Sequence, residues 1–154
     1  GVALALRDGE HVSFARGEPG TLLLADGWSP PESWGTWASD QQASLVVRLD
    51  RSLFADGARL VLTAHALLPL QDTSKVVHVS IDDAPLGSLN LTGDPSQQDL
   101  CIPAARLPEG RAFTLTLRTD RAAQSPAALK LSGDARPLNF AVSGLTVGHC
   151  QPSP

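Results

Sequence analysis

The residues best suited to chemistry are three tryptophans crowded into one short stretch, Trp28, Trp34 and Trp37. Glu32 lies among them, and Asp40 follows shortly after. The C–H face of a sugar ring packs on the flat face of an indole, while a nearby carboxylate orients the hydroxyl groups, so this combination predicts a carbohydrate-binding surface. The alternative is that the rings pack the edge of the fold and hold a long loop. We expect that structural role for at least two of the three.

A second polar group, Asp134 and Arg136, lies late in the chain with one residue between its members. On an extended backbone, side chains two residues apart point to the same side. Such a pair could bind a polar ligand. The expected role is a structural clamp, in which Arg136 forms a bidentate pair with a carboxylate such as Glu32 or Asp134.

Catalysis has little support in the sequence. Ser143-Gly144 lacks the leading glycine of a nucleophile elbow. A glycosidase needs two carboxylates flanking a cleft, and Glu32 with Asp40 or Asp134 is the pair that would serve. No Cys/His cluster has zinc-site spacing, and no glycine-rich phosphate loop is present, so we expect no metal and no cofactor.

The isolated histidines and the two cysteines carry weaker signals. His65 and His78 fall in strand patterns, where we expect partly buried side chains with satisfied hydrogen bonds. Cys101 and Cys150 are either unpaired core thiols or a disulfide. A thiol four residues from the C-terminus is a poor core residue, so a disulfide that ties the tail to the Cys101 strand is favoured, and it implies an oxidising compartment.

Composition narrows the class of protein. The 154 residues are 42% hydrophobic and 18% charged, which suits one domain with its own core, expected over residues 1–150 with a tail at 151–154. The net charge of −4 argues against nucleic acid as a partner. No apolar run approaches the roughly 20 residues that span a bilayer, so we expect no transmembrane segment in this chain.

These side chains must be positioned by short segments in which apolar and polar residues alternate. The chain's 13 glycines and 12 prolines mark the connections between the segments. A hairpin is predicted around Asp8-Gly9, and a short apolar strand over Thr21–Leu24. Further strands are predicted over 44–50, 59–68, 75–81, 88–91, 99–103, 113–118 and 139–147. Helical turns are expected within 51–58 and 127–131. The pattern predicts an all-β fold, an antiparallel β-sandwich of the jelly-roll type with short helical turns in its loops.

The two polar and aromatic stretches also carry a family resemblance. The matching residues are Gly27-Trp28-Ser29, Glu32-Ser33-Trp34-Gly35-Thr36-Trp37-Ala38-Ser39-Asp40 and Ser132-Gly133-Asp134-Ala135-Arg136-Pro137-Leu138. In this respect the chain resembles a carbohydrate-binding-like β-sandwich domain appended to bacterial glycosyltransferases and phosphoglycerol-transferase-like membrane proteins that handle surface polysaccharides. Asn139 stands where members of that family usually have glycine.

The resemblance implies an extracytoplasmic, periplasmic or secreted, non-catalytic accessory domain that acts in the synthesis or recognition of bacterial surface polysaccharide. Its expected partners are a glycan and other domains of a parent membrane protein, and a fragment of a larger enzyme is an open alternative. Two other hypotheses stay open. One is a structural or protein-interaction module that packs against a partner enzyme or membrane domain, and the other is a glycoside hydrolase or lyase that uses Glu32.

Overall fold

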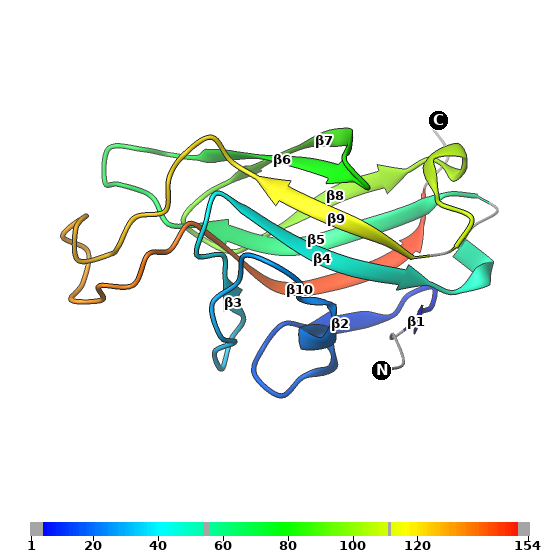
Figure 1. Cartoon of the computed structure of the whole chain (residues 1–154), viewed down its shortest axis with the longest axis horizontal. Coiled ribbons are helices and arrows are strands. Elements are labelled where there is room, and N and C mark those ends of the chain that lie inside the picture. The colour runs from blue at the N-terminus through cyan, green and yellow to red at the C-terminus, as the bar shows by residue number, and fades with distance from the viewer. Residues whose placement is uncertain (1–4, 54–55, 111, 151–154) are drawn as a thin grey trace.

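Two facing β-sheets make up the structure, a computed structural model that describes residues 5–53, 56–110 and 112–150 (Figure 1). One sheet has the strand order β1 (Ala5–Leu6), β4 (Gln42–Leu49), β9 (Ala112–Arg118), β6 (Lys75–Ile81) and β7 (Ala84–Leu91). The other has the order β2 (His11–Ser13), β10 (Phe140–His149), β5 (Ala58–Ala66) and β8 (Ser96–Ile102), and β3 (Thr36–Trp37) also pairs with β10.

The strand order is that of a jelly roll. From β3 onward, the order β3-β10-β5-β8 faces the order β4-β9-β6-β7, and every pair within these two sets is antiparallel. This is the two-Greek-key arrangement of eight strands. The predicted all-β, antiparallel sandwich is confirmed, with β1 as an added strand that pairs with β4 in parallel.

Strand β5 shows how the sequence sorts its side chains between core and surface. Its odd and even positions alternate between buried and partly exposed along the whole strand. Leu60 and Leu62 are buried in the core between the sheets. The side chains that point outward are Arg59, Val61, Thr63 and His65. We call the surface that they share with the outward side chains of β3, β10 and β8 the β5 face.

The hairpin predicted around Asp8-Gly9 is wrong. Gly9 does form a turn, with φ +80°, but β1 pairs with β4 and β2 pairs with β10, so the two strands enter different sheets. The backbone groups that a hairpin would join find other partners. The Gly9 N–H donates to the carbonyl of Val147, and the Asp50 N–H donates to the carbonyl of Leu6.

The strand predicted over Thr21–Leu24 is also wrong, because the segment lies mostly in a short 3-10 helix, η1 (Pro19–Leu23). Proline at the first helical position favours this start, since it has no N–H to leave unsatisfied. Leu23 packs into the core, whereas Leu22 is 72% exposed. The apolar run therefore buries one leucine and leaves its neighbour in solvent.

Of the two predicted helical turns, that within 51–58 is confirmed as η2 (Arg51–Leu53), whereas 127–131 forms hydrogen-bonded turns without a helix. A further 3-10 turn, η3 (Ala104–Arg106), follows β8. The expected tail at 151–154 lies outside the described residues. No helix within the described ranges has the length and apolar character needed to cross a membrane.

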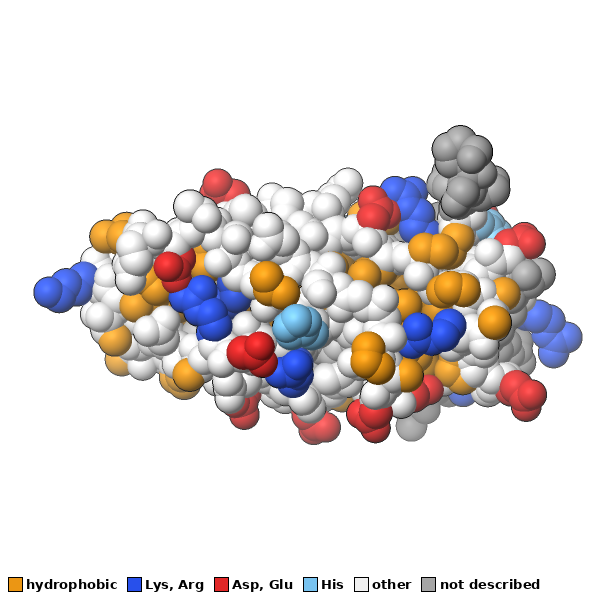
Figure 2. Space-filling view, turned by 90° about the horizontal axis from the view of Figure 1, so that it is seen from above, with side chains coloured by type: hydrophobic (Ala, Val, Ile, Leu, Met, Phe, Trp, Pro, Cys, Tyr) orange, Lys and Arg blue, Asp and Glu red, His pale blue; other side chains and the backbone are white. Residues whose placement is uncertain are grey.

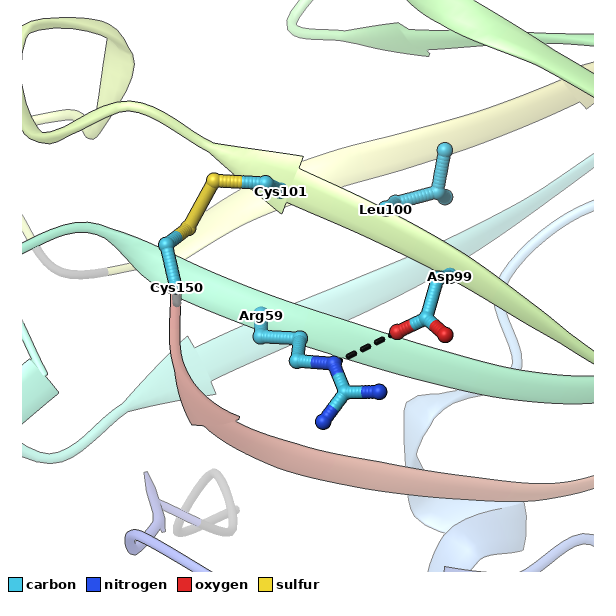
Figure 3. A pocket seen from close by; sticks show the side chains of 5 residues that line it. All are labelled: Arg59, Asp99, Leu100, Cys101 and Cys150. Atoms are coloured by element: carbon cyan, nitrogen blue, oxygen red, sulfur yellow. Dashed lines mark hydrogen bonds and ion pairs between the residues drawn. A yellow bond between two sulfur atoms is a disulfide. The ribbon is translucent and has the colours of Figure 1, made fainter. Parts of the chain in front are cut away.

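The predicted disulfide is confirmed between Cys101 and Cys150 (Figure 3). Cys101 lies near the end of β8, and Cys150 directly follows β10. Strand β5 runs between these two strands, so the bond fastens the end of β10 to the edge strand across β5.

Candidate functional site

Trp28 has a structural role. Its ring meets that of Phe140 edge to face, with centroids 6.2 Å apart, and its indole Nε1–H donates to the carbonyl of Ser44 at 2.7 Å. Phe140 belongs to one sheet and Ser44 to the other. Trp28 therefore fastens the start of the tryptophan-rich loop to both layers, as expected for a ring that packs the edge of the fold.

The other two tryptophans form a cluster with a histidine, which we call the ring cluster (Trp34, Trp37 and His65). The ring centroids lie 5.5 Å apart for the two tryptophans, 5.2 Å for Trp34 and His65, and 4.9 Å for Trp37 and His65. Trp37 is opposite Ala141 on β10, and Ala141 is opposite His65 on β5, so the small alanine separates the two larger rings. Trp34 is 38% exposed.

A rigid turn holds Trp34 in place. The Glu32 N–H donates to the carbonyl of Gly35 at 2.8 Å and closes the turn. Gly35 is pressed against β10, where a Cβ would come within 2.6 Å of the Val142 carbonyl oxygen. The buried Thr36 hydroxyl donates to the carbonyl of Phe14 at 2.8 Å. A ligand would therefore have little of this turn to order, which favours affinity because ordering a loop on binding costs free energy.

His65 is the member of the cluster that the sequence did not identify as a site residue. Its Nδ1 is buried and has no hydrogen-bond partner among the described residues, so the prediction of a satisfied side chain is wrong for this atom. Burial lowers the pKa of His65, against a smaller opposing effect of Asp94. The imidazole is therefore neutral at pH 7 and adds to the apolar surface beside the tryptophans.

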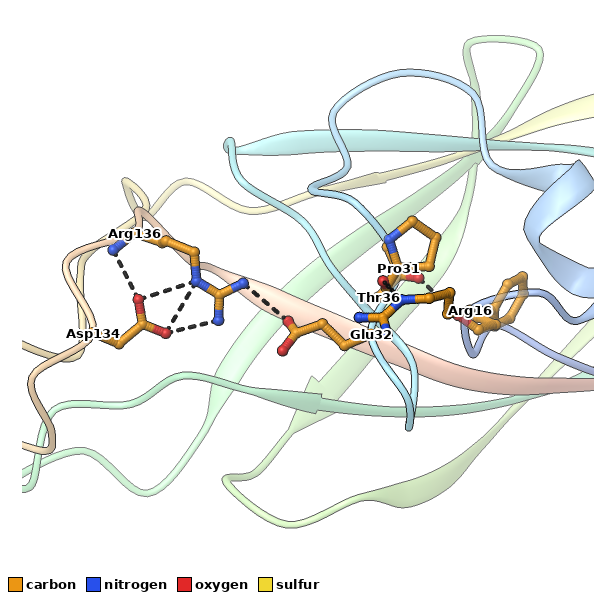
Figure 4. Close-up of polar contacts among 7 residues, drawn as sticks. Arg16, Pro31, Glu32, Thr36, Asp134 and Arg136 are labelled. Atoms are coloured by element: carbon orange, nitrogen blue, oxygen red, sulfur yellow. Dashed lines mark hydrogen bonds and ion pairs between the residues drawn. The ribbon is translucent and has the colours of Figure 1, made fainter.

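Arg136 forms the predicted clamp (Figure 4). Its guanidinium donates to both carboxylate oxygens of Asp134, at 2.7–3.1 Å, and to Oε2 of Glu32 at 3.1 Å. The hydrogen bonds from Arg136 lower the pKa of Asp134 to about 2. The clamp joins the tryptophan-rich loop to the segment before β10, and it occupies three of the four polar side chains that the sequence offered for ligand binding.

Asp40 lies apart from these groups. Its Oδ1 accepts a hydrogen bond from the N–H of Gln41. It lines a hollow of about 370 Å³ that Gln42 and Arg118, from the β4–β9 sheet, also line. The structure thus gathers Glu32, Asp134 and Arg136 into one group and Trp34 and Trp37 into another, with the turn at 32–35 between them.

Within the ranges that the structure covers, no group of three or more His, Cys, Asp or Glu side chains is placed to hold a metal ion.

No family model matches the sequence, and no curated protein matches it. Solved structures do resemble it. The CBM36-1 domain of a multidomain xylanase from the hindgut metagenome of Trinervitermes trinervoides has a TM-score of 0.50 and 12% identity, over 94% of this chain and 100% of that one. A carbohydrate-binding module CBM36 in complex with calcium and xylotriose has a TM-score of 0.49 and 14% identity, over 90% and 99%.

A third similar structure is a larger protein, the acetyl xylan esterase Est2A from the rumen bacterium Butyrivibrio proteoclasticus. Its TM-score is 0.51 at 11% identity, and the match covers 96% of this chain but 34% of the esterase. At identities this low, the structural similarity shows a common fold and nothing more. The chain therefore has the β-sandwich fold that the CBM36-1 domain also has.

Proposed function

We propose that the chain is a non-catalytic glycan-binding domain and that the ring cluster is its sugar-stacking surface. The observation that carries this proposal is the packing of Trp34 and Trp37 with His65 on the outside of a sheet, with Trp34 38% exposed on a rigid turn. A preformed apolar surface of this kind suits the C–H face of a sugar. The clamp behind it keeps the turn in place.

The setting that we propose is the outside of a bacterial cell, in the synthesis or recognition of surface polysaccharide. The Cys101–Cys150 disulfide supports an extracytoplasmic location, since disulfides persist in oxidising compartments. The fold common to this chain and a xylanase CBM36-1 domain supports a glycan as partner. The motif resemblance supports attachment to a membrane enzyme, and residues 1–150 would act as one domain within it.

A structural or interaction module is the second candidate, because Trp28 and the clamp both serve the fold itself. Two observations favour glycan binding over it. Trp34 is 38% exposed, whereas a purely structural role would bury all three rings. On the side of the molecule above β6 and β7, hydrophobic side chains are scattered among polar and charged ones (Figure 2), which is unlike the large apolar patch of a docking surface.

Hydrolysis by Glu32 is disfavoured by the clamp. A general acid in a glycosidase needs a pKa raised toward neutrality. Arg136 lies between Glu32 and Asp134 and binds both, and it lowers the pKa of Asp134 to about 2, in the direction opposite to that of an acid catalyst.

The test is calorimetric titration with soluble xylan, cellulose, mannan and bacterial exopolysaccharide oligosaccharides. Trp34→Ala should lower the affinity for a bound glycan about thirtyfold, because truncating an aromatic hot spot costs about 2 kcal/mol. Leu22→Ala, at a leucine exposed elsewhere on the surface, is the matched control and should leave the affinity unchanged.

Two outcomes would contradict the proposal. Full affinity in a folded Trp34→Ala variant would exclude the ring cluster as the site. Absence of binding by the wild-type chain to every glycan class would exclude glycan binding itself.

A further inference from the structure

The β5 face extends beyond the ring cluster to two hollows at the other end of the strand. Arg59 points to the same side as His65, six positions along β5, which corresponds to about 20 Å of extended chain. A hollow of about 480 Å³ lies between Arg59, Asp99 and the disulfide (Figure 3). A second, of about 340 Å³, is lined by Arg59 together with Val61 and Thr146.

Arg59 is oriented at the border of both hollows. Its Nε–H donates to Oδ1 of Asp99 at 2.5 Å, and this hydrogen bond lowers the pKa of the Asp99 carboxyl. Neither the terminal amino groups of Arg59 nor Oδ2 of Asp99 has another hydrogen-bond partner among the described residues. The pair therefore presents free donors and a free acceptor side by side, fixed by its own internal bond.

Uncharged residues lie between the two ends of the β5 face. Thr63 is opposite Gln97 on β8, and Val61 is opposite Asp99. On the other side of β5, Thr63 is opposite Gly144 of β10. The path from the ring cluster to Arg59 thus follows Thr63 and Gln97, while on the β10 side the His11 imidazole lies over Gly144, 2.7 Å from where a Cβ would stand.

We propose that the Arg59–Asp99 pair and its hollows form a second sugar subsite of the same surface, and that the ligand is a linear, uncharged oligosaccharide running along β5. This inference rests on the proposed function. Adjacent sugar hydroxyls both donate and accept, as the pair does. The pair is neutral overall, and the chain carries a net charge of −4, so its electrostatic field disfavours a polyanionic ligand.

The experiment is a calorimetric length series, from disaccharide to hexasaccharide, of the neutral glycan that the wild-type chain binds. Wild-type affinity should rise about tenfold or more along the series as the second subsite fills. Arg59→Gln should remove this rise and leave the disaccharide affinity within about twofold of wild type, since the substitution is on the surface.

Arg118→Gln is the matched control, because Arg118 also pairs with an aspartate, Asp120, but lies in the other sheet. Its length dependence should equal that of the wild-type chain. Equal hexasaccharide affinity in folded Arg59→Gln, or no length dependence in the wild-type chain, overturns the second subsite. If a series of uronic acid oligosaccharides binds more tightly than the neutral series and Arg59→Gln removes the difference, the proposal of an uncharged ligand is overturned.

The two proposals fail separately. If Arg59→Gln has no effect on the length dependence while Trp34→Ala still lowers the disaccharide affinity, the ring cluster remains the site and only the second subsite is excluded. Disaccharide binding that Trp34→Ala does not change removes the proposed site itself.

Discussion

At the scale of single residues, Arg136 binds two carboxylates at once and so fixes the role of both. It binds Asp134 two residues away and Glu32 across 104 residues of sequence. A guanidinium suits this task, because its planar fork donates in two directions at once. Both carboxylates, which the sequence offered for a ligand or a catalytic step, instead hold the loop that carries Trp34.

The acid stability of the clamp is a first prediction. The pKa of Asp134 falls from 3.8 to about 2 on folding, so its stabilising contribution is present above pH 3.8 and is lost as the pH falls through about 2. Wild type should therefore be more stable than Arg136→Gln at pH 6, and the gap should close toward pH 2. Urea unfolding midpoints at pH 6, 4, 3 and 2 measure this. A gap that stays constant would contradict it.

A second prediction separates Trp28 from the ring cluster. Trp28→Phe keeps an aromatic ring beside Phe140 but removes the donor to the Ser44 carbonyl. We expect a loss of about 1–2 kcal/mol in the free energy of unfolding, from the lost hydrogen bond and a small cavity. Glycan affinity should not change. Urea unfolding and titration of the same variant check both parts, and a fall in affinity without a fall in stability would reverse the assignment.

At the scale of elements, most of the longer strands could be predicted from the sequence but their neighbours in the sheets could not. Alternation along β5 divides its side chains into two sets that point to opposite faces, because side-chain direction depends only on local backbone geometry. The approach of His65 to Trp37 depends on the register of β3, β10 and β5, which joins segments far apart in sequence. The hairpin predicted around Asp8-Gly9 was wrong for the same reason, since pairing with distant strands overrode a local hairpin preference.

The start of β6 illustrates another long-range tie that the sequence did not reveal. Lys75 is 3% exposed, and its Nζ donates to the carbonyl of Leu67 and to both the backbone carbonyl and Oδ1 of Asn139. The Asn139 side-chain amide in turn donates to the carbonyl of Arg121. Asn139 thus joins the start of β6 to the backbone at Arg121.

Lys75 yields a third prediction. Burial, aided by Arg121, lowers the pKa of Lys75 from 10.5 to about 8. Between these values the unfolded chain holds a proton that the folded chain has released, so the contribution of Lys75 to the free energy of unfolding rises from pH 8 to pH 10.5. Wild type should gain stability relative to Lys75→Met over that range. Urea unfolding at pH 7.5, 9 and 10 tests the sign, and a shrinking difference would contradict it.

At the scale of the whole molecule, the disulfide and the jelly roll together make one sheet a fixed surface. The bond joins β8 to the end of β10, and β3 and β2 pair with other parts of β10. The ring cluster and the Arg59–Asp99 pair both lie on the outside of this sheet. A site built on paired strands keeps its geometry better than a site on loops alone.

Removing the disulfide is the fourth prediction. The bond closes a loop with a sequence separation of 49, and its loss should cost about 2–4 kcal/mol of the free energy of unfolding. The Cys101→Ala, Cys150→Ala double variant should melt at a lower temperature than the oxidised wild-type chain and match the reduced one. Calorimetric melting with and without reductant measures this. Equal melting temperatures for all three would show that the bond is dispensable.

The most direct test of the central claim is the response of the tryptophan indole signals to a bound glycan. The chain has three tryptophans, so a proton–nitrogen correlation spectrum should show three indole N–H peaks, assigned with single Trp→Phe variants. Titration with a neutral oligosaccharide should move the peaks of Trp34 and Trp37, which lie in the ring cluster, and leave that of Trp28, whose N–H is bound to the Ser44 carbonyl. Saturating glycan that leaves the Trp34 and Trp37 peaks in place, or that moves only the Trp28 peak, would contradict the assignment of the β5 face as the binding surface.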